Sequence, residues 1–403
     1  MTNLQNLLNE LCPNGVEYKT LGEIATDIYR GSGITRNQVT ESGTPCVRYG
    51  EIYTTYGIWF DHCVSYTNAE QISNRKYFEY GDILFAITGE SVDEIAKSCA
   101  YIGHEQCLAG GDIVVLKHEQ DPKYLSYALA TTSAQAQKSR GKVKSKVVHS
   151  SVPAIKEICV PVPPLEVQQE IVRILDHFTA LTAELNDKLT AELTARKKQY
   201  AYYRDKLLTQ QKETTEMTLG DIGAVCMCKR IMKAETSSEG EVPFFKIGTF
   251  GKEPDAYITR EKFDEYREKY SFPRKGDILI SAAGTIGRTV IYDGKPAYYQ
   301  DSNIVWLSND ESKVLNKYLF YYYQLQPWAV STGGTIARLY NDNISKAKIT
   351  VPSLEAQRRI VSILDRFDAL CNDLTSGLPA EIEARKKQYE YYRDKLLSFK
   401  VKT

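Results

Sequence analysis

The most regular chemical pattern in this 403-residue chain is a run of basic residues at every second position. Its cations are Lys138, Arg140, Lys142, Lys144 and Lys146. Alternate side chains of an extended segment share one side, so this spacing would direct all five cations at one line of phosphates. A solvated surface loop is the plain alternative. We favour the phosphate-binding interpretation, which predicts a nucleic acid as the partner.

Further basic residues stand beside glycines, which allow a backbone to approach a duplex closely. Cations contact phosphates, and arginine also reads base edges. Residues 29–36 correspond in order to residues 228–230, residues 88–90 to 284–288, and the basic run to residues 333–338. Ordinary hairpin turns would give similar patterns. The remaining candidate DNA contacts are Arg30, Ser32, Arg36, Arg48, Tyr49, Thr88, Lys229, Arg230, Lys246, Thr285, Arg288 and Arg338.

Motifs for catalysis are missing from the sequence. The chain has no GxxxxGK[ST] nucleotide loop, and the glycines at residues 31–33 lack the helix of a dinucleotide site. The tetrapeptide Asp121-Pro122-Lys123-Tyr124 partly matches that of adenine methyltransferases but lacks its second proline, so we interpret it as a helix N-terminus. The five histidines show no ligand spacing. We therefore expect no catalytic, metal-binding or cofactor-binding residue in this chain.

The composition indicates a folded protein of two or three domains, with 42% hydrophobic and 11% aromatic residues. The sequence has no apolar run of about 18 residues and no signal-like start, so we expect a soluble, cytoplasmic protein without a membrane anchor. Cys226 and Cys228 are the only close pair among nine cysteines, and we expect buried reduced thiols rather than a zinc site. The 51 basic residues balance 51 acidic ones, which permits only a locally basic face.

The elements that position these residues are written twice. Residues 163–208 and 352–397 align without a gap at an offset of 189, with 29 of 46 positions identical, including ARKKQY and YYRDKLL. Apolar residues recur at steps of three and four, which predicts two helices of about 60–70 Å each. Ser353 is a candidate N-cap, and Gly377 with Pro379 predicts a kink or break in the second copy.

The segments before the two copies correspond loosely. Both contain LG(E/D)I and GDIL, and both alternate short β-rich runs with turn signals. Residues 124–136 and 314–326 have a helical pattern. Each variable segment therefore predicts an α+β domain of about 140 residues. If these domains sit at opposite ends, the two helices must run antiparallel; a homodimerising coiled coil is the alternative.

This layout resembles the specificity subunits of type I restriction–modification systems along nearly the whole chain. The resemblance rests on the opening LLNELCPNGVEYKTLGEI, on GDIL at Gly81 and Gly276, and on the duplicated ARKKQYxYYRDKLL. It rests also on the helix openings that place Gln168 and Gln357 three residues after a leucine. Each motif is weak by itself, but their duplication and order make the resemblance specific.

The resemblance implies two pseudo-two-fold-related target-recognition domains separated by two long antiparallel coiled-coil helices. The expected divisions are an arm (1–16), recognition domains (17–162 and 213–351) and helical regions (163–212 and 352–403). Each domain would read one half of a split, asymmetric site on double-stranded DNA. Two methyltransferase subunits and the restriction subunits would assemble on the helical regions and carry S-adenosylmethionine, ATP and magnesium. Candidate subunit contacts are Gln168, Arg196, Lys197, Tyr200, Tyr203, Gln357, Arg385, Lys386, Tyr389 and Tyr392.

Two rival functions remain at this stage. A self-contained methyltransferase would bind S-adenosylmethionine by itself, and the missing cofactor motif disfavours it. A coiled-coil scaffold with protein-binding heads would bind no specific DNA even with its partners present. We also expect the tyrosines near residues 200 and 389 to pack against a partner helix rather than stack on bases.

Overall fold

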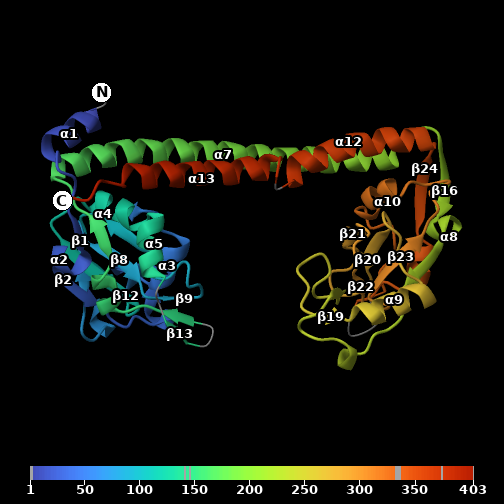
Figure 1. Ribbon diagram of the computed structural model, residues 1–403, viewed down its shortest axis with the longest axis horizontal. Coiled ribbons are helices and arrows are strands. Elements are labelled where there is room, and N and C mark those ends of the chain that lie inside the picture. The colour runs from blue at the N-terminus through green and yellow to red at the C-terminus, as the bar shows by residue number, and fades with distance from the viewer. Residues whose placement is uncertain (1–2, 140–141, 145–146, 332–336, 374, 403) are drawn as a thin grey trace. The chain divides into compact units, whose positions relative to one another are not determined.

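The computed structural model describes residues 3–139, 142–144, 147–331, 337–373 and 375–402 (Figure 1). The chain forms two compact units. Unit 1 comprises Met1–Lys188 with Ile382–Thr403, and unit 2 comprises Leu189–Glu381. Each mixes helices with several small sheets, which confirms the predicted α+β class.

The core of unit 1 is a five-stranded sheet in the order β2-β12-β8-β10-β5. Its strands are β2 (Ala25–Arg30), β12 (Ile113–His118), β8 (Ile83–Ala86), β10 (Ser98–Tyr101) and β5 (Trp59–Phe60). The second sheet orders β3 (Val39–Thr40), β6 (Ser65–Thr67), β4 (Thr44–Val47), β11 (Cys107–Ala109) and β7 (Tyr77–Phe78). Two smaller sheets pair β13 (Lys142–Lys144), β14 (Val147–His149) and β9 (Thr88–Gly89), and β1 (Tyr18–Thr20) with β15 (Cys159–Pro161).

Six shorter helices complete the recognition domain and arm of unit 1. They are α1 (Asn3–Leu11), α2 (Leu21–Ile24), α3 (Tyr49–Thr54), α4 (Pro122–Leu129), α5 (Thr132–Lys138) and α6 (Val152–Lys156). Asp121 caps α4 through a hydrogen bond from the Tyr124 N–H, and Pro122 occupies its first turn, which confirms the predicted helix start.

Unit 2 repeats this plan with fewer strands. Its central sheet orders β17 (Ala224–Met227), β23 (Ile304–Ser308), β20 (Ile278–Ser281) and β21 (Thr289–Ile291). Its other sheets contain β19 (Tyr257–Ile258), β18 (Val242–Phe245) and β22 (Tyr298–Tyr299), and β16 (Thr214–Thr218) with β24 (Lys348–Pro352). Its shorter helices are α8 (Leu219–Ile222), α9 (Arg260–Lys269), α10 (Asn316–Tyr323) and α11 (Asn341–Ser345).

The duplicated GDIL motif forms a turn that leads into a central strand of each unit. Gly81 and Gly276 share φ = 94°, a value that favours glycine. The carboxylate of Asp82 accepts a hydrogen bond from the Glu79 N–H (2.9 Å), and that of Asp277 accepts one from Arg274 (2.7 Å). The motif therefore marks the equivalent strands β8 and β20 and fixes their registers.

The repeated segments are long helices, as predicted. Helix α7 runs without a break from Leu165 to Thr209, whereas the second copy divides into α12 (Leu354–Asn372) and α13 (Leu378–Leu396). Ser353 caps α12 by accepting a hydrogen bond from the Ala356 N–H. The chain turns at Gly377, where a Cβ would lie 2.5 Å from the Ala369 carbonyl oxygen. The predicted break is confirmed.

Each unit contains a helix pair. In unit 2, Phe367 of α12 contacts Tyr200 and Tyr203 of α7, while Cys371, one turn later, lies near Lys197, so the two helices run antiparallel. In unit 1 the hydroxyl of Tyr389 on α13 lies 2.8 Å from that of Thr179 on α7.

The chain beyond α13 pairs with the end of the N-terminal arm of unit 1. The Val16 N–H donates to the Lys400 carbonyl (2.8 Å) and the Lys402 N–H donates to the Val16 carbonyl (3.0 Å). The next residue along, Glu17, accepts a hydrogen bond from the Val162 N–H just before α7 (2.8 Å). The C-terminal segment thus lies beside the start of α7.

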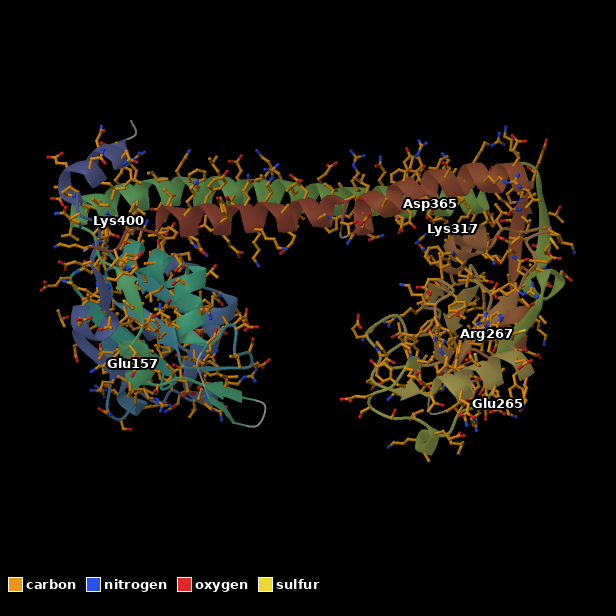
Figure 2. The ribbon with its side chains drawn as sticks, viewed as in Figure 1. Glu157, Glu265, Arg267, Lys317, Asp365 and Lys400 are labelled. Carbon is orange, nitrogen blue, oxygen red and sulfur yellow. The ribbon has the colours of Figure 1, made fainter. Side chains whose placement is uncertain are left out.

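In both units, a lysine and a tyrosine of the recognition domain contact an aspartate of a long helix. We call these three residues the clamp. In unit 2, the Lys317 ammonium on α10 pairs with Asp365 on α12 at 3.1 Å (Figure 2). The Tyr321 hydroxyl donates to the same carboxylate. In unit 1, Lys123 and Tyr127 on α4 contact Asp176 on α7 at 2.7 and 2.8 Å. The long helices thus carry each domain through buried and partly buried side chains.

Candidate nucleic-acid interface

Four candidate contacts of unit 1 gather around one loop, residues 110–112, which we call the 110–112 loop. It joins β11 to β12 and is held by a hydrogen bond from the Gly110 N–H to the Val47 carbonyl (2.8 Å). Arg30 donates its Nη2–H to Asp112 at 2.6 Å and its Nε–H to the Gly111 carbonyl. The predicted residues Arg36, Arg48 and Tyr49 line a surface pocket together with this loop.

Arg48 is fixed by a buried acidic partner. Its Nε lies 3.2 Å from the Glu51 carboxylate, which also accepts hydrogen bonds from the Arg48 N–H and from the Ser65 hydroxyl. Glu51 is buried, whereas Tyr49 is exposed beside it. The arrangement holds a cation and an aromatic ring at the protein surface, a combination that suits a phosphate and a base or sugar.

Two predicted contacts of unit 1 are wrong. Lys138 ends helix α5 rather than standing in an extended segment, and its buried ammonium donates to the Leu129 carbonyl (2.8 Å) and the Ser98 hydroxyl (3.0 Å). Burial lowers the pKa of Lys138 to about 7. Ser32 is also buried, where its hydroxyl donates to the Asn74 carbonyl and accepts from the Lys76 N–H, both at 2.7 Å. Neither side chain faces a duplex in this structure.

Two further residues of the basic run belong to a hairpin. Lys142 and Lys144 lie in β13, which pairs with β14, and β14 pairs in turn with β9. The predicted extended backbone is therefore present for these two residues. Thr88 of β9 lies 3.3 Å from the ring of His149, which joins this hairpin to the loop after β8. Arg140 and Lys146 lie outside the described residues.

The candidate contacts of unit 2 gather around the equivalent loop, residues 300–303, which we call the 300–303 loop. The Arg230 Nε–H donates to Asp301 at 2.8 Å. The Arg338 Nη2–H donates to the Ser302 carbonyl at 2.9 Å. Lys246 pairs with Asp255 at 2.9 Å, and Arg230, Lys246 and the loop line one surface pocket. Three cations that lie far apart in the sequence thus meet at one place.

Lys229, Thr285 and Arg288, which were also predicted, are not among the residues that line this pocket. The Lys229 ammonium lies 5.3 Å from the centre of the Tyr270 ring. Arg288 donates to the Phe250 carbonyl at 2.9 Å, and Thr285 is exposed in the loop before it. Of the counterpart of the basic run, residues 333–336 lie outside the described residues.

Two predicted subunit contacts are wrong as well. Gln168 and Gln357 are fully buried and bond within the chain. Gln168 accepts from the Asp121 N–H (3.0 Å) and donates to the Pro163 carbonyl (2.7 Å), and Gln357 accepts from the Leu315 N–H (2.8 Å) and donates to the Pro352 carbonyl (2.9 Å). They join each helix start to its recognition domain, so their side chains offer nothing to a partner.

The predicted tyrosines divide between the helix pairs. Tyr200 is buried against Phe367, and the Tyr389 hydroxyl contacts Thr179, so both pack against a neighbouring helix as predicted. Because Tyr200 is buried within the chain, its candidate role as a subunit contact is wrong. Tyr203 and Tyr392 keep substantial exposure. The basic candidates Arg196, Lys197, Arg385 and Lys386 lie on α7 and α13, where Arg196 pairs with Glu192 at 2.7 Å and both lysines are exposed.

The helix pair of unit 1 carries an apolar groove that sequence reasoning missed. Phe178, Leu181 and Leu185 of α7 line it, and Tyr389 and Tyr392 of α13 face them. Phe178 is 42% exposed. A surface groove of this kind marks an interaction site, because soluble proteins rarely expose adjoining large apolar side chains.

The 110–112 and 300–303 loops were also missed. A glycine pair followed by aspartate, directly before a buried β-strand, is the only sequence signal of the first loop, and ordinary turns share it. Only the fold brings these loops against arginines some 70 to 80 residues away in sequence.

Within the described part of the chain, no group of three or more histidine, cysteine, aspartate or glutamate side chains is placed to hold a metal ion. The helices described here include none that is long and apolar enough to span a membrane.

Comparison with known proteins adds a family to this geometry. The profile of the type I restriction modification DNA specificity domain matches residues 13–195 and 211–384. A putative type I restriction enzyme specificity subunit from Haemophilus influenzae is 57% identical over 263 residues, which cover 64% of this chain and 68% of that protein. The EcoR124I/EcoR124II specificity subunit of Escherichia coli is 37% identical over 266 residues, which cover 60% of this chain and 63% of that protein.

Solved structures share the fold at low identity. A chain from a structure of a type I R-M system, described for its complex assembly and conformational transition, aligns with a TM-score of 0.69 and 18% identity over 96% of this chain and 98% of that one. The HsdS subunit of Thermoanaerobacter tengcongensis aligns with a TM-score of 0.51 and 18% identity over 96% of both chains.

Proposed function

The chain belongs to the family of type I restriction–modification DNA specificity domains, and from this membership we propose that it directs a methyltransferase and nuclease complex to one split DNA sequence. Unit 1 reads one half-site and unit 2 reads the other. The complex works in the cytoplasm on double-stranded DNA. The observation that carries the proposal is the presence of two copies of the domain, each with arginines gathered around a loop before its last central strand.

The two half-sites differ in sequence. The 110–112 loop reads Gly-Gly-Asp, whereas the 300–303 loop reads Gln-Asp-Ser-Asn, so the polar groups offered to base edges are not the same. A specificity subunit built from two unlike readers selects an asymmetric site. Positions that the two units share, such as GDIL and the clamp aspartates, support the fold instead.

The chemistry is supplied in trans. In this proposal the chain is a non-catalytic targeting subunit, two methyltransferase subunits carry S-adenosylmethionine, and restriction subunits carry ATP and magnesium. The methyltransferase subunits dock on the helix pairs. The exposed groove of Phe178, Leu181, Leu185 and Tyr392 supports this location in unit 1, because large apolar side chains suit a stable interface.

The test is to co-express the chain with its genomic neighbours, purify the complex and map adenine methylation on the host genome. We expect a methyltransferase to co-purify and one split, asymmetric motif to be modified. Loss of that motif on deletion of the chain completes the result. A chain that purifies by itself, with no motif lost on its deletion, would favour the scaffold function.

Charge reversal tests the docking surface. Lys197→Glu with Lys386→Glu changes two exposed positions that sit outside the buried joints, so the fold should persist while the methyltransferase no longer co-purifies. Normal complex from this double variant would remove these lysines from the interface.

A further inference from the structure

In each unit one arginine beside the candidate interface is held by an aspartate. Arg30 pairs with Asp112 at 2.6 Å, and Arg230 pairs with Asp301 at 2.8 Å. The arginines are 59% and 65% exposed. Asp301 is 16% exposed and Asp112 is 38% exposed, so in both pairs the carboxylate is the more covered member and the guanidinium projects outward.

The two pairs are not copies of one another. GDIL makes Phe85 equivalent to Ile280, and their strand partners are Val114 and Val305. Asp112 lies two residues before Val114, whereas Asp301 lies four residues before Val305. The arginines differ in the same way: Arg30 pairs with Val114 in the sheet, whereas Arg230 comes three residues after Met227, the partner of Val305.

This mismatch is informative about function. Duplication of the gene would place a structural ion pair at equivalent positions, as it does for the clamp of Asp176 and Asp365. The arginine–aspartate pair instead occurs twice between the same two elements at different positions. A role in the chemistry of the interface explains that better than a role in holding the fold.

The backbone beneath Arg230 is anchored on every side. Cys228 and Ile231, which flank Lys229 and Arg230, are buried. The Tyr298 hydroxyl donates to the Lys229 carbonyl at 2.9 Å. The Gln300 N–H donates to the Phe245 carbonyl at 2.9 Å, which fixes the loop that carries Asp301. An exposed arginine on a rigid base, steered by a covered carboxylate, keeps one orientation without losing much entropy on binding.

The remaining donors of these guanidinium groups match guanine. Aspartate takes the Nε–H of Arg230, and Asp112 with the Gly111 carbonyl takes the Nη2–H and Nε–H of Arg30. Each guanidinium keeps N–H groups on its outer end, where two of them lie parallel. That fork donates to O6 and N7 of guanine in the major groove, which is the commonest specific contact of arginine.

We propose that Arg30 and Arg230 are specificity-determining residues, each of which reads a guanine in the half-site bound by its own unit. Asp112 and Asp301 are positioning residues that aim the arginines. The inference rests on the proposed function and deepens it by assigning one base type in each half-site to a named side chain. The shifted positions of the two pairs place the two guanines at different points within their half-sites.

The test uses the complete methyltransferase complex and its genomic methylation motif. Arg230→Lys keeps the charge but loses the fork, and Arg230→Ala loses both. We expect both variants to lose preference for guanine at one position of one half-site, with discrimination against the other bases falling on the order of 10- to 100-fold. Arg30→Lys should do the same in the other half-site. Asp301→Asn should weaken the same position as Arg230→Lys, by a smaller factor.

Lys229→Ala is the matched control, because it removes a neighbouring exposed cation that has no carboxylate partner among the described residues. It should lower methylation uniformly without changing the motif, as loss of a phosphate contact does. For a variant with too little methylation to score, binding of its purified complex to duplexes with each half-site position substituted gives the same readout.

The failures are distinguishable. A wild-type complex that modifies no split motif overturns the proposed function itself. A normal wild-type motif that Arg30→Lys and Arg230→Lys leave unchanged overturns this inference and leaves the function intact. Relaxation of the same half-site by both variants, or at a position that is not guanine, also overturns it.

Discussion

Unit 1 and unit 2 share the contacts that hold the fold together, but they differ in side chains at other positions. Both have a GDIL strand, a glutamine that joins the helix start to the domain, and a lysine–tyrosine–aspartate clamp. They differ at the loop before the last central strand and at the end of the helix that carries the lysine and tyrosine of the clamp. There, Lys138 donates to the carbonyl of Leu129 at the end of α4, whereas Trp328 packs on Tyr323 at the end of α10.

The comparison separates two kinds of residue. The repeated groups named above make bonds inside the chain, and the groups that differ between the recognition domains lie at the surface pockets or fill space behind them. The helix pairs extend the lesson. Equivalent residues form a closed aromatic contact in unit 2, with the Phe367 and Tyr203 rings 5.8 Å apart, and an open groove at Phe178 and Tyr392 in unit 1. The same residue types at equivalent positions therefore do not ensure an identical surface.

The largest expected effect tests the shared joint. Gln168→Ala and Gln357→Ala each leave a buried N–H and carbonyl without their partners and open a cavity, so each should lower the free energy of unfolding by about 3 kcal/mol. Equal losses, measured by urea unfolding, would sharpen the view that both glutamines have one structural role. Gln169→Ala, at an exposed position beside Gln168, is the control and should change stability by less than about 0.5 kcal/mol. Preserved stability in either buried variant would contradict that role.

The second prediction compares equivalent phenylalanines in the two helix pairs. Phe367→Ala removes a ring that stacks on Tyr203, and it should cost about 2–3 kcal/mol of stability in unit 2. Phe178→Ala removes a partly exposed ring, and it should cost less than about 1 kcal/mol while weakening capture of the methyltransferase. Thermal unfolding and co-purification measure the two effects. Equal destabilisation by both changes would mean that the groove of unit 1 closes in solution.

Local patterns in the sequence predicted the parts of the fold that depend on neighbouring residues. The 3.6-residue period located α7, Ser353 marked a cap, and Gly377 marked the break. These features need only nearby residues, and the structure confirms them. The duplication predicted two similar domains, and their bounds stay a prediction.

The site resisted prediction because its geometry depends on distant residues. Lys138 continues a basic alternation, yet Phe85, Ser98 and Leu129 surround its ammonium, and the first two lie far from it in sequence. From the sequence, Gln168 is expected to be a surface residue at a helix start. In the structure, Asp121 and Gln120 pack against it and form hydrogen bonds with its side chain. The aspartates that hold Arg30 and Arg230 follow the same rule, since a turn residue shows no sign of its partner.

The third prediction follows from the buried amine of unit 1. Burial holds the pKa of Lys138 at about 7, against an ordinary value of 10.5. Between these values the unfolded chain binds more protons than the folded chain, so stability rises with pH by up to about 1.4 kcal/mol per unit. Lys138→Met should remove this rise, which unfolding curves between pH 7 and 9.5 would detect. The exposed Lys156→Met is the control, and a slope that survives in Lys138→Met would assign the pH dependence to other groups.

The smallest effect concerns the basic hairpin, which has no described counterpart strand pair in unit 2. Replacing Lys142, Lys144 and Lys146 with alanine should weaken DNA binding by the complex on the order of tenfold. The more diagnostic change is in the salt dependence, because each lost phosphate contact reduces the slope of log K against log salt by about 0.9. Fluorescence anisotropy across a salt series measures both quantities. The motif should stay the same, since phosphate contacts carry no sequence information. An unchanged slope would mean that the hairpin does not contact DNA. Unit 1 would then contact DNA through the 110–112 loop, as unit 2 is proposed to do through the 300–303 loop, and the two units would be more alike than their sequences suggest.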